Sequence, residues 1–343
     1  APAALSMPYW TRYWEKKMDS FLGIDTSAYT SSLALVDEEQ NIIADERMIL
    51  QVGAGKRGLR QSEAFFQHIK NLPFLFARLA SYFAAPVKAI GASAWPRRVE
   101  GSYMPVFSAG FSQAEVLSRF TGISLYSFSH QEGHIMAGIK GNEEILERAE
   151  FLAVHFSGGT SELLHVRRQQ GGFLDISPAL AGIDLHAGQL VDRVGVAMGL
   201  DFPCGPELEK IAWQSSGENL PIMPSSVSDK GFSFSGAETR AQKLIAEGIS
   251  YPDIALASLR CIANTLEKSI LQESDKKGIK DVLLVGGVMA NSIIKERLQA
   301  RLEHPAVGLK LFFASPGLSS DNAVGVALAA QFILRKTEGG RSH

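Results

Sequence analysis

The hydrophobic positions of the chain first form a strand–turn–strand–turn–strand pattern near the N-terminus. Apolar runs at 21–25 and 33–36 flank small polar residues, and a charged turn at 37–41 separates them from a third run at 42–49. Short apolar runs bounded by polar turns are typical of β-strands. We therefore predict an antiparallel meander over residues 21–49.

The same pattern returns 130 residues later. Residues 21–36 align with residues 151–166 without a gap, with seven identities in sixteen positions, and a third strand is predicted at 173–176. Because identity and strand pattern agree, we interpret the two segments as copies of an internal duplication. Two similar halves that each begin with such a hairpin favour a ligand cleft between them.

The rest of the chain alternates between helical and strand-like spacing, which is typical of an α/β protein. An extended segment is predicted at 229–238. Strands are predicted at 87–92, 125–128, 281–285 and 311–314. Helices are predicted at 61–82, 107–120, 254–271, 291–302 and 323–334. One further helix is predicted to end at residue 198, and another to begin at residue 208.

Composition places the chain among globular proteins of about two domains. It has 343 residues, 45% of them hydrophobic, and a formal net charge of −2, which argues against a strongly basic nucleic-acid binder. Cys204 and Cys261 show no pairing pattern, which indicates a reducing compartment, and we expect a cytoplasmic protein. No apolar run is long enough for a membrane span, and residues 1–17 lack the apolar core of a signal peptide.

The turns of both meanders are candidate phosphate-binding loops. Ser157-Gly158-Gly159-Thr160 suits this role, because glycine permits close approach of backbone N–H groups and hydroxyls can donate hydrogen bonds. The first copy, Ser27-Ala28-Tyr29-Thr30, has no glycine and a bulky tyrosine. A plain hairpin turn is the alternative for both. Gly286-Gly287, between a predicted strand and a predicted helix, is a further nucleotide-site candidate with the same alternative.

The segment Ser129-His130-Gln131-Glu132-Gly133-His134 contains the strongest chemical signal. If Ser129 caps a helix, His130 and His134 share one face and are close enough to bind one metal ion. Two imidazoles need a further ligand. Asp321 is the candidate, although Asp is also a preferred helix N-cap, and two packed histidines are the alternative to a metal site.

The ordered set of motifs resembles the TsaD (Gcp) family. His130 to His134 is similar to its H-x-E-G-H, Phe156 to Thr160 to its V-S-G-G-H, and Gly188 to Asp192 to its G-E-A-F-D. Four more segments follow in the family's order: Pro203 to Pro206 (P-G-G-P), Phe232 to Gly236 (F-S-F-S-G), Gly286 to Asn291 (G-G-x-x-x-N) and Asp321 to Ala323 (D-N-A). The resemblance extends from about Phe21 to Ala330.

The resemblance implies two duplicated RNase H-like domains of the actin/Hsp70/sugar-kinase (ASKHA) type with an interdomain cleft. The expected boundaries are an extension at 1–17, a first domain at 18–148 plus 321–340, and a second at 149–320. It also implies one divalent metal, Fe(II) with Zn as the alternative, held by His130, His134 and Asp321. Substrate contacts would come from Phe156, Ser157, Gly158, Gly159, Thr160, Asp192, Gly205 and Asn291.

The implied reaction is transfer of a threonylcarbamoyl group from threonylcarbamoyl-AMP to N6 of the adenosine beside the anticodon of tRNA. The implied ligand is threonylcarbamoyl-AMP or another adenine nucleotide. We expect tRNA to be bound through partner subunits, and a TsaB-like heterodimer partner or a homodimer. We expect no membrane association.

Several positions depart from the family pattern. Its first hairpin has an Asp-Glu pair where this chain has Tyr29 and Thr30, and its S-G-G-H histidine is Thr160 here. Its G-E-A-F-D glutamate is Gln189, the first P-G-G-P glycine is Cys204, and A-G-P-G is replaced around Ala94 to Arg97. We therefore interpret the chain as a diverged paralogue, and a nucleotide-binding scaffold or regulator is the alternative function. A kinase or ATPase is disfavoured by the weak first hairpin, and an endopeptidase by Gln131 in place of the zincin glutamate.

Overall fold

The computed structural model describes residues 19–27, 29–52, 59–82, 85–169 and 173–339. The expected extension at 1–17 and Ala28 of the first hairpin lie outside the described residues. Contacts divide the chain into two compact units, the first made of Ala1–Pro96, Tyr103–Phe128 and Val326–His343, and the second of Arg97–Ser102 and Ser129–Gly325. The domain boundaries expected from the family resemblance remain a prediction.

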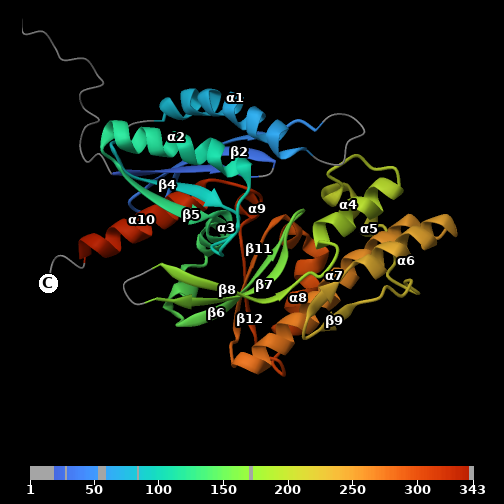
Figure 1. The fold of residues 1–343 in the computed structure, drawn as a ribbon. Helices are drawn as coiled ribbons and strands as arrows, with labels where there is room; N and C mark the ends of the chain where they lie inside the picture. The colour runs from blue at the N-terminus through green and yellow to red at the C-terminus, as the bar shows by residue number, and fades with distance from the viewer. Residues whose placement is uncertain (1–18, 28, 53–58, 83–84, 170–172, 340–343) are drawn as a thin grey trace, which may run out of the picture. The chain divides into compact units, whose positions relative to one another are not determined.

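The first unit contains a five-stranded sheet in the order β3-β2-β1-β4-β5. The antiparallel meander predicted for residues 21–49 is present as β1 (Ser20–Thr26), β2 (Thr30–Asp37) and β3 (Ile42–Ile49), and β4 (Val87–Trp95) pairs in parallel with β1. The helices α1 (Gln61–Ala80) and α2 (Pro105–Thr121) lie side by side against this sheet (Figure 1). Their apolar faces and the strands bury one core, with Ile24, Leu33 and Leu75 fully enclosed.

The second unit repeats this topology. Its sheet has the order β12-β11-β6-β7-β8, so an antiparallel meander is again extended on one side by parallel strands. Phe21 pairs with Val36 in the first meander and Phe151 pairs with Val166 in the second, an equal register at a shift of 130. The predicted duplication is confirmed. The strands are β6 (Glu150–Phe156), β7 (Ser161–Arg168), β8 (Leu174–Ala181), β11 (Asp281–Val285) and β12 (Lys310–Phe313).

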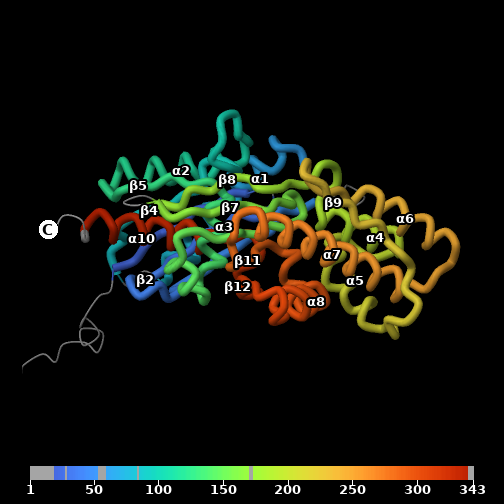
Figure 2. The backbone as a smooth tube through the Cα atoms, turned by 90° about the horizontal axis from the view of Figure 1, so that it is seen from below, coloured from blue at the N-terminus to red at the C-terminus, as the bar shows by residue number. Residues whose placement is uncertain are grey.

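A cluster of helices completes the second unit. The helices α4 (Ala187–Ala197), α5 (Gly205–Ala212), α6 (Ser235–Ala246) and α7 (Tyr251–Lys277) pack against one another (Figure 2). The small hairpin β9 (Ser226–Ser228) and β10 (Gly231–Ser233) precedes α6. The remaining elements are β5 (Ser124–Ser129), α3 (His130–Ile139), η2 (Glu143–Glu147), η3 (Gly287–Ala290), α8 (Ser292–Leu302), α9 (Pro316–Ser319) and α10 (Val324–Gly339). None of the helices in the described part of the chain is long and apolar enough to cross a membrane.

The extended segment predicted at 229–238 is partly wrong, because α6 begins at Ser235. Asp184 accepts hydrogen bonds from the backbone N–H of Phe234 at 3.1 Å and from the hydroxyls of Ser233 and Ser235. These bonds outweigh the burial of the Asp184 carboxyl, which alone would raise its pKa, and hold that pKa far below its ordinary value. A carboxylate about fifty positions away therefore fixes the end of the strand and the start of the helix.

Candidate functional site

The helix α3 begins at the histidine motif, as predicted. Ser129 is its N-cap: its hydroxyl accepts from the backbone N–H of Glu132 at 3.1 Å, and the Glu132 carboxylate accepts from the backbone N–H of Ser129 at 2.6 Å. This reciprocal capping box fixes the first turn. The Nε2 atoms of His130 and His134 consequently lie 3.0 Å apart, with ring centroids at 4.4 Å.

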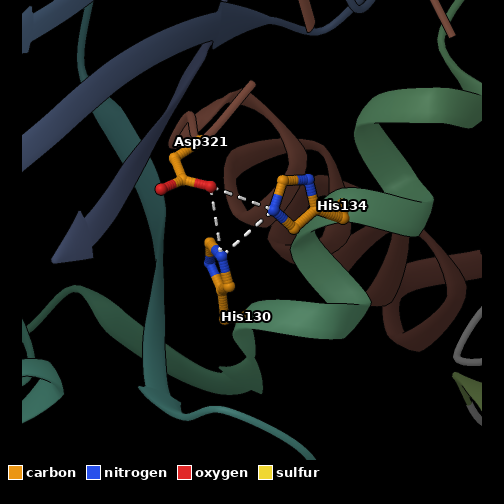
Figure 3. Close-up of side chains that lie close together, drawn as sticks. All are labelled: His130, His134 and Asp321. Carbon is orange, nitrogen blue, oxygen red and sulfur yellow. Dashed lines mark hydrogen bonds and ion pairs between the residues drawn. The ribbon is translucent and has the colours of Figure 1, made fainter. Parts of the chain in front are cut away.

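Asp321 completes a group of three potential metal ligands. Its Oδ1 lies 3.5 Å from His130 Nε2 and 3.3 Å from His134 Nε2. Figure 3 shows the carboxylate pointing toward both rings. The neighbouring Asn322 donates its side-chain N–H to the Leu318 and Ser320 carbonyls and accepts from the Gly325 N–H at 3.3 Å. Asn322 therefore holds the turn before α10, and the carboxylate of Asp321 is directed at both imidazoles.

The donor set fits a single transition-metal ion. Two imidazoles and one carboxylate are ligands that Fe(II) and Zn accept. Ligands about 2.1 Å from an ion and separated by 90–110° lie roughly 3.0–3.4 Å apart, and the three observed separations are 3.0, 3.3 and 3.5 Å. Burial alone would raise the pKa of Asp321, but hydrogen bonds with His130 and His134 hold it well below its ordinary value. The carboxyl group is therefore already in its metal-binding form.

Two arginines anchor the residues between the histidines. Arg98 donates from Nε to the buried carboxylate of Glu132 at 2.9 Å. Arg97 pairs with Glu162 at 2.8 Å, and Gln131 donates to the same carboxylate at 2.7 Å. Burial raises the pKa of Glu162, and the charge of Arg97 only partly offsets that effect. Sequence analysis did not find these pairs, since nothing in the local pattern joins residues 34 to 65 positions apart.

The glycine hairpin presents small residues at the surface. Gly158 and Gly159 are exposed, and Ser157 and Thr160 are partly exposed. Gly188, in the first turn of α4, lies so close that an added Cβ would be 2.6 Å from the Ser157 carbonyl oxygen. The hairpin thus lies against the N-terminal end of α4. Phe156 differs, because its ring is fully buried against Phe232, so any substrate contact at this position would come from its backbone.

The other predicted substrate residues have structural partners. Asp192 accepts from the backbone N–H of Cys204 at 2.9 Å, which places it beside Gly205 at the start of α5. Burial raises the pKa of Asp192, and the hydrogen bond from the Cys204 N–H offsets this rise only in part. Asn291 caps α8 by accepting from the Ile294 N–H at 3.0 Å. Their roles in substrate binding remain predictions.

The first hairpin buries its hydroxyl residues Ser27, Thr30 and Ser31 within its own unit. His68 lies in the core, with Nε2 at 2.7 Å from the Ser27 carbonyl and Nδ1 at 2.8 Å from the Ser31 hydroxyl. The Asn71 amide donates to that hydroxyl at 3.1 Å. Thr30 is also buried, whereas the equivalent Thr160 is partly exposed, and the exposed Gly159 of the second hairpin stands where the first has the exposed Tyr29. The two copies therefore share a fold but present different groups to solvent.

Sequence analysis also missed His155. It lies near the end of β6, is 3% exposed, and its ring packs against that of His134 with centroids 4.5 Å apart. Burial lowers its pKa well below the ordinary value, and the neighbouring His134 and His130 lower it further. A single histidine in a buried strand gives no sequence signal that separates a core residue from a site residue.

Comparison with solved structures identifies the fold class. Component A of the (R)-2-hydroxyglutaryl-CoA dehydratase of Acidaminococcus fermentans is 15% identical, with a TM-score of 0.54 over 93% of this chain and 99% of that chain. A ROK family glucokinase from Streptomyces griseus is 11% identical, with a TM-score of 0.52 over 91% of this chain and 99% of that chain. These likenesses show an α/β fold of the actin/Hsp70/sugar-kinase type.

Sequence comparison identifies the family within this class. The family model TsaD, described as tRNA N6-adenosine threonylcarbamoyltransferase, matches residues 62–328. A Thermus thermophilus protein named tRNA N6-adenosine threonylcarbamoyltransferase is 30% identical over 317 residues, which cover 90% of this chain and 91% of the relative. The chain belongs to the TsaD family.

Proposed function

We propose that this chain transfers a threonylcarbamoyl group from threonylcarbamoyl-AMP to N6 of the tRNA adenosine beside the anticodon, forming t6A. The observation that carries the proposal is the convergence of His130 Nε2, His134 Nε2 and Asp321 Oδ1, whose ligand atoms all lie within 4.8 Å of one another, in a member of the TsaD family. These residues would hold one divalent ion, Fe(II) or Zn. Such an ion, when bound, supplies a Lewis acid that polarises the carbamoyl oxygen.

The hairpin at 157–160 is the proposed phosphate site. Its glycines are exposed, and it lies against the N-terminal end of α4, where the helix dipole and the first N–H groups favour an anion. Small side chains let the backbone approach a phosphate oxygen closely. The chain's own residues would thus bind and orient the adenylate, with Asp192, Gly205 and Asn291 as further candidate contacts.

We further propose that tRNA is bound with partner subunits. The net charge of −2 provides no general excess of positive charge for phosphate contacts. A TsaB-like heterodimer partner or a second copy of the chain would complete the RNA-binding surface. The expected cytoplasmic location belongs to the same proposal.

A catalytically impaired scaffold or regulator is the second candidate function. The observation that favours it is the first hairpin, where Tyr29 and Thr30 stand at the family's Asp-Glu pair and Ser27, Thr30 and Ser31 are buried. On this alternative the protein binds an adenine nucleotide without transferring the acyl group. Introducing Tyr29→Asp together with Thr30→Glu then creates no activity.

The test is a reconstitution in which the full chain is loaded with Fe(II) or Zn. Threonylcarbamoyl-AMP is then added, together with tRNA and partner subunits from the same organism. Mass spectrometry of the digested tRNA should show t6A, and AMP should be released in equal amount. His134→Ala should abolish turnover, whereas His165→Gln on β7, whose Nε2 pairs with Glu150 at 2.7 Å, should not. Nucleotide binding without turnover would favour the scaffold.

A further inference from the structure

Arg97 is a partly exposed cation beside the point where the glycine hairpin joins β7. Its Nε donates to the Glu162 carboxylate at 3.1 Å, and its Nη2 lies 2.8 Å from the same carboxylate. Glu162 is the second residue of β7, directly after the hairpin at 157–160. The Glu162 carboxylate therefore holds the guanidinium of Arg97 next to the proposed phosphate site.

The same position is close to the helix that carries the two histidines. Glu162 pairs with His155 across β6 and β7, so the two side chains point to the same face of the sheet. The ring of His155 packs against that of His134, and Gln131 of α3 donates to Glu162 at 2.7 Å. Arg97 is thus attached to the hairpin on the face that α3 covers.

The start of α4 approaches the hairpin at the same place. The backbone N–H of Ala187 donates to the Ser161 hydroxyl at 2.8 Å. Burial lowers the pKa of His186, the N-cap of α4, and the positive charge of Arg97 lowers it further, which requires the two side chains to be near each other. The hairpin, the first turn of α4 and the guanidinium of Arg97 therefore converge on one location.

We propose that Arg97 is a specificity-determining residue that binds the phosphate of the adenylate together with the hairpin backbone. The inference rests on the proposed adenylate site. A guanidinium has five N–H donors, and the pair with Glu162 uses its Nε–Nη2 edge. The Nη1–Nη2 edge has the fork geometry that matches two phosphate oxygens.

The departures from the family pattern agree with this role. The family has a histidine where this chain has Thr160, and its A-G-P-G segment is replaced around Ala94 to Arg97. The chain thus lacks a basic side chain within the hairpin and has one beside it. A cation at this position makes the site select a nucleotide over the uncharged nucleoside.

An ion pair that only neutralises the buried Glu162 is the competing explanation. Arg97→Gln and Glu162→Gln both break this pair, so on that explanation the two variants change AMP binding alike. If Arg97 binds the phosphate, Arg97→Gln weakens AMP binding. Glu162→Gln then leaves AMP binding unchanged or strengthens it, because a negative charge near the phosphate is removed. Adenosine, which has no phosphate, should bind equally to the wild type and both variants.

The experiment measures the affinities of the Zn-loaded full chain for AMP and for adenosine by calorimetry. We expect Arg97→Gln to lower the AMP affinity about 10- to 100-fold, the usual effect of losing a hydrogen bond to a charged group, and to leave the adenosine affinity unchanged. Arg148→Gln is the matched control, because Arg148 is similarly exposed and its Nε pairs with Asp281 at 3.2 Å. Unchanged AMP affinity in Arg97→Gln, or an equal loss for AMP and adenosine, would overturn the inference.

A second comparison decides if Arg97→Gln does not fold. The double variant Arg97→Gln/Glu162→Gln leaves no carboxylate buried without its partner, and it differs from Glu162→Gln only at Arg97. An equal preference for AMP over adenosine in these two variants would refute phosphate binding by Arg97. The readout is affinity, so AMP selectivity that depends on Arg97 supports the inference even if no t6A forms. If the wild type binds neither ligand, the proposed adenylate site is wrong and the inference falls with it.

Discussion

Gly325 lies against the backbone of Gly133 so closely that a Cβ at position 325 would be 1.8 Å from the Gly133 carbonyl oxygen. Gly133 is the residue before His134 in α3, and Gly325 follows Asp321 by four positions. A larger residue at position 325 cannot be accommodated without moving one backbone away from the other. This contact brings the carboxylate of Asp321 to the two imidazoles.

Gly325→Ala should therefore separate Asp321 from the histidines. The neighbour is a backbone oxygen that cannot rotate away, so we expect the unfolding free energy to fall by about 1–3 kcal/mol. Metal affinity should fall by about 10- to 100-fold, the usual effect of disturbing groups that position metal ligands. Chelator competition and urea unfolding measure the two effects.

Gly317→Ala is the control for this substitution. Apart from its chain neighbours and the backbone of its own helix α9, an alanine Cβ at position 317 would have no atom within 4 Å. Metal affinity should stay at the wild-type value. Equal affinity in Gly325→Ala and the wild type would contradict the role assigned to the glycine contact.

Arg98→Ala should weaken the same centre through the first turn of α3. Glu132, which is 2% exposed, would lose its bonds from Arg98, and the capping box that orients His130 would lose support. We expect about 1–2 kcal/mol of lost stability, reduced from the value for a fully buried pair because Arg98 is half-exposed. The thermal unfolding temperature and the Co²⁺ affinity should both decrease.

Arg119→Ala provides a matched comparison on α2. Its partner Glu115 is 4.0 Å away and both side chains are largely exposed, so stability should change by less than about 0.5 kcal/mol. If Arg98→Ala is no more destabilising than Arg119→Ala, the anchoring role of Arg98 is refuted.

The repeated fold and the histidine pair of the candidate site could be predicted from the sequence, because both depend on local patterns. The meanders are local, so alternation and turn residues predict them, and the His130–His134 spacing predicts a shared helix face. Asp321 lies 187 residues after His134, and its own segment is equally suited to a helix cap. Only the ordered set of family motifs identifies Asp321 as a candidate metal ligand. His155, Arg98 and the start of α6 depend on contacts between distant segments, which no local pattern records.

The metal-free protein should lose stability between pH 7.5 and 5.5, in part through His68. Burial lowers the pKa of His68 from 6.5, and the bond to the Ser27 carbonyl and the charge of Asp25 oppose this only partly. Below about pH 6.5 the unfolded chain binds a proton that the folded chain does not, so the unfolding free energy falls with pH by at most about 1.4 kcal/mol per pH unit for this group.

His68→Gln tests that assignment by urea unfolding at both pH values. Glutamine retains hydrogen-bonding groups but does not titrate, so the stability difference between pH 7.5 and 5.5 should become smaller than in the wild type. The pKa of His186 is also lowered by burial, and its contribution remains in both proteins. An unchanged difference between the two pH values would show that His68 does not contribute.

Gly188→Ala should weaken nucleotide binding by moving the hairpin away from α4. The added Cβ would lie 2.6 Å from the Ser157 carbonyl oxygen and 2.7 Å from the Gly158 Cα, both backbone atoms. Separating the hairpin from the helix N-terminus removes part of the proposed phosphate site, and we expect the affinity for AMP, measured by calorimetry, to fall about 10-fold, equivalent to roughly 1.4 kcal/mol. Gly236→Ala on α6, whose nearest neighbour would be Pro224 at 3.4 Å, should bind AMP normally. Wild-type affinity in Gly188→Ala would remove the hairpin–helix contact from the proposed site.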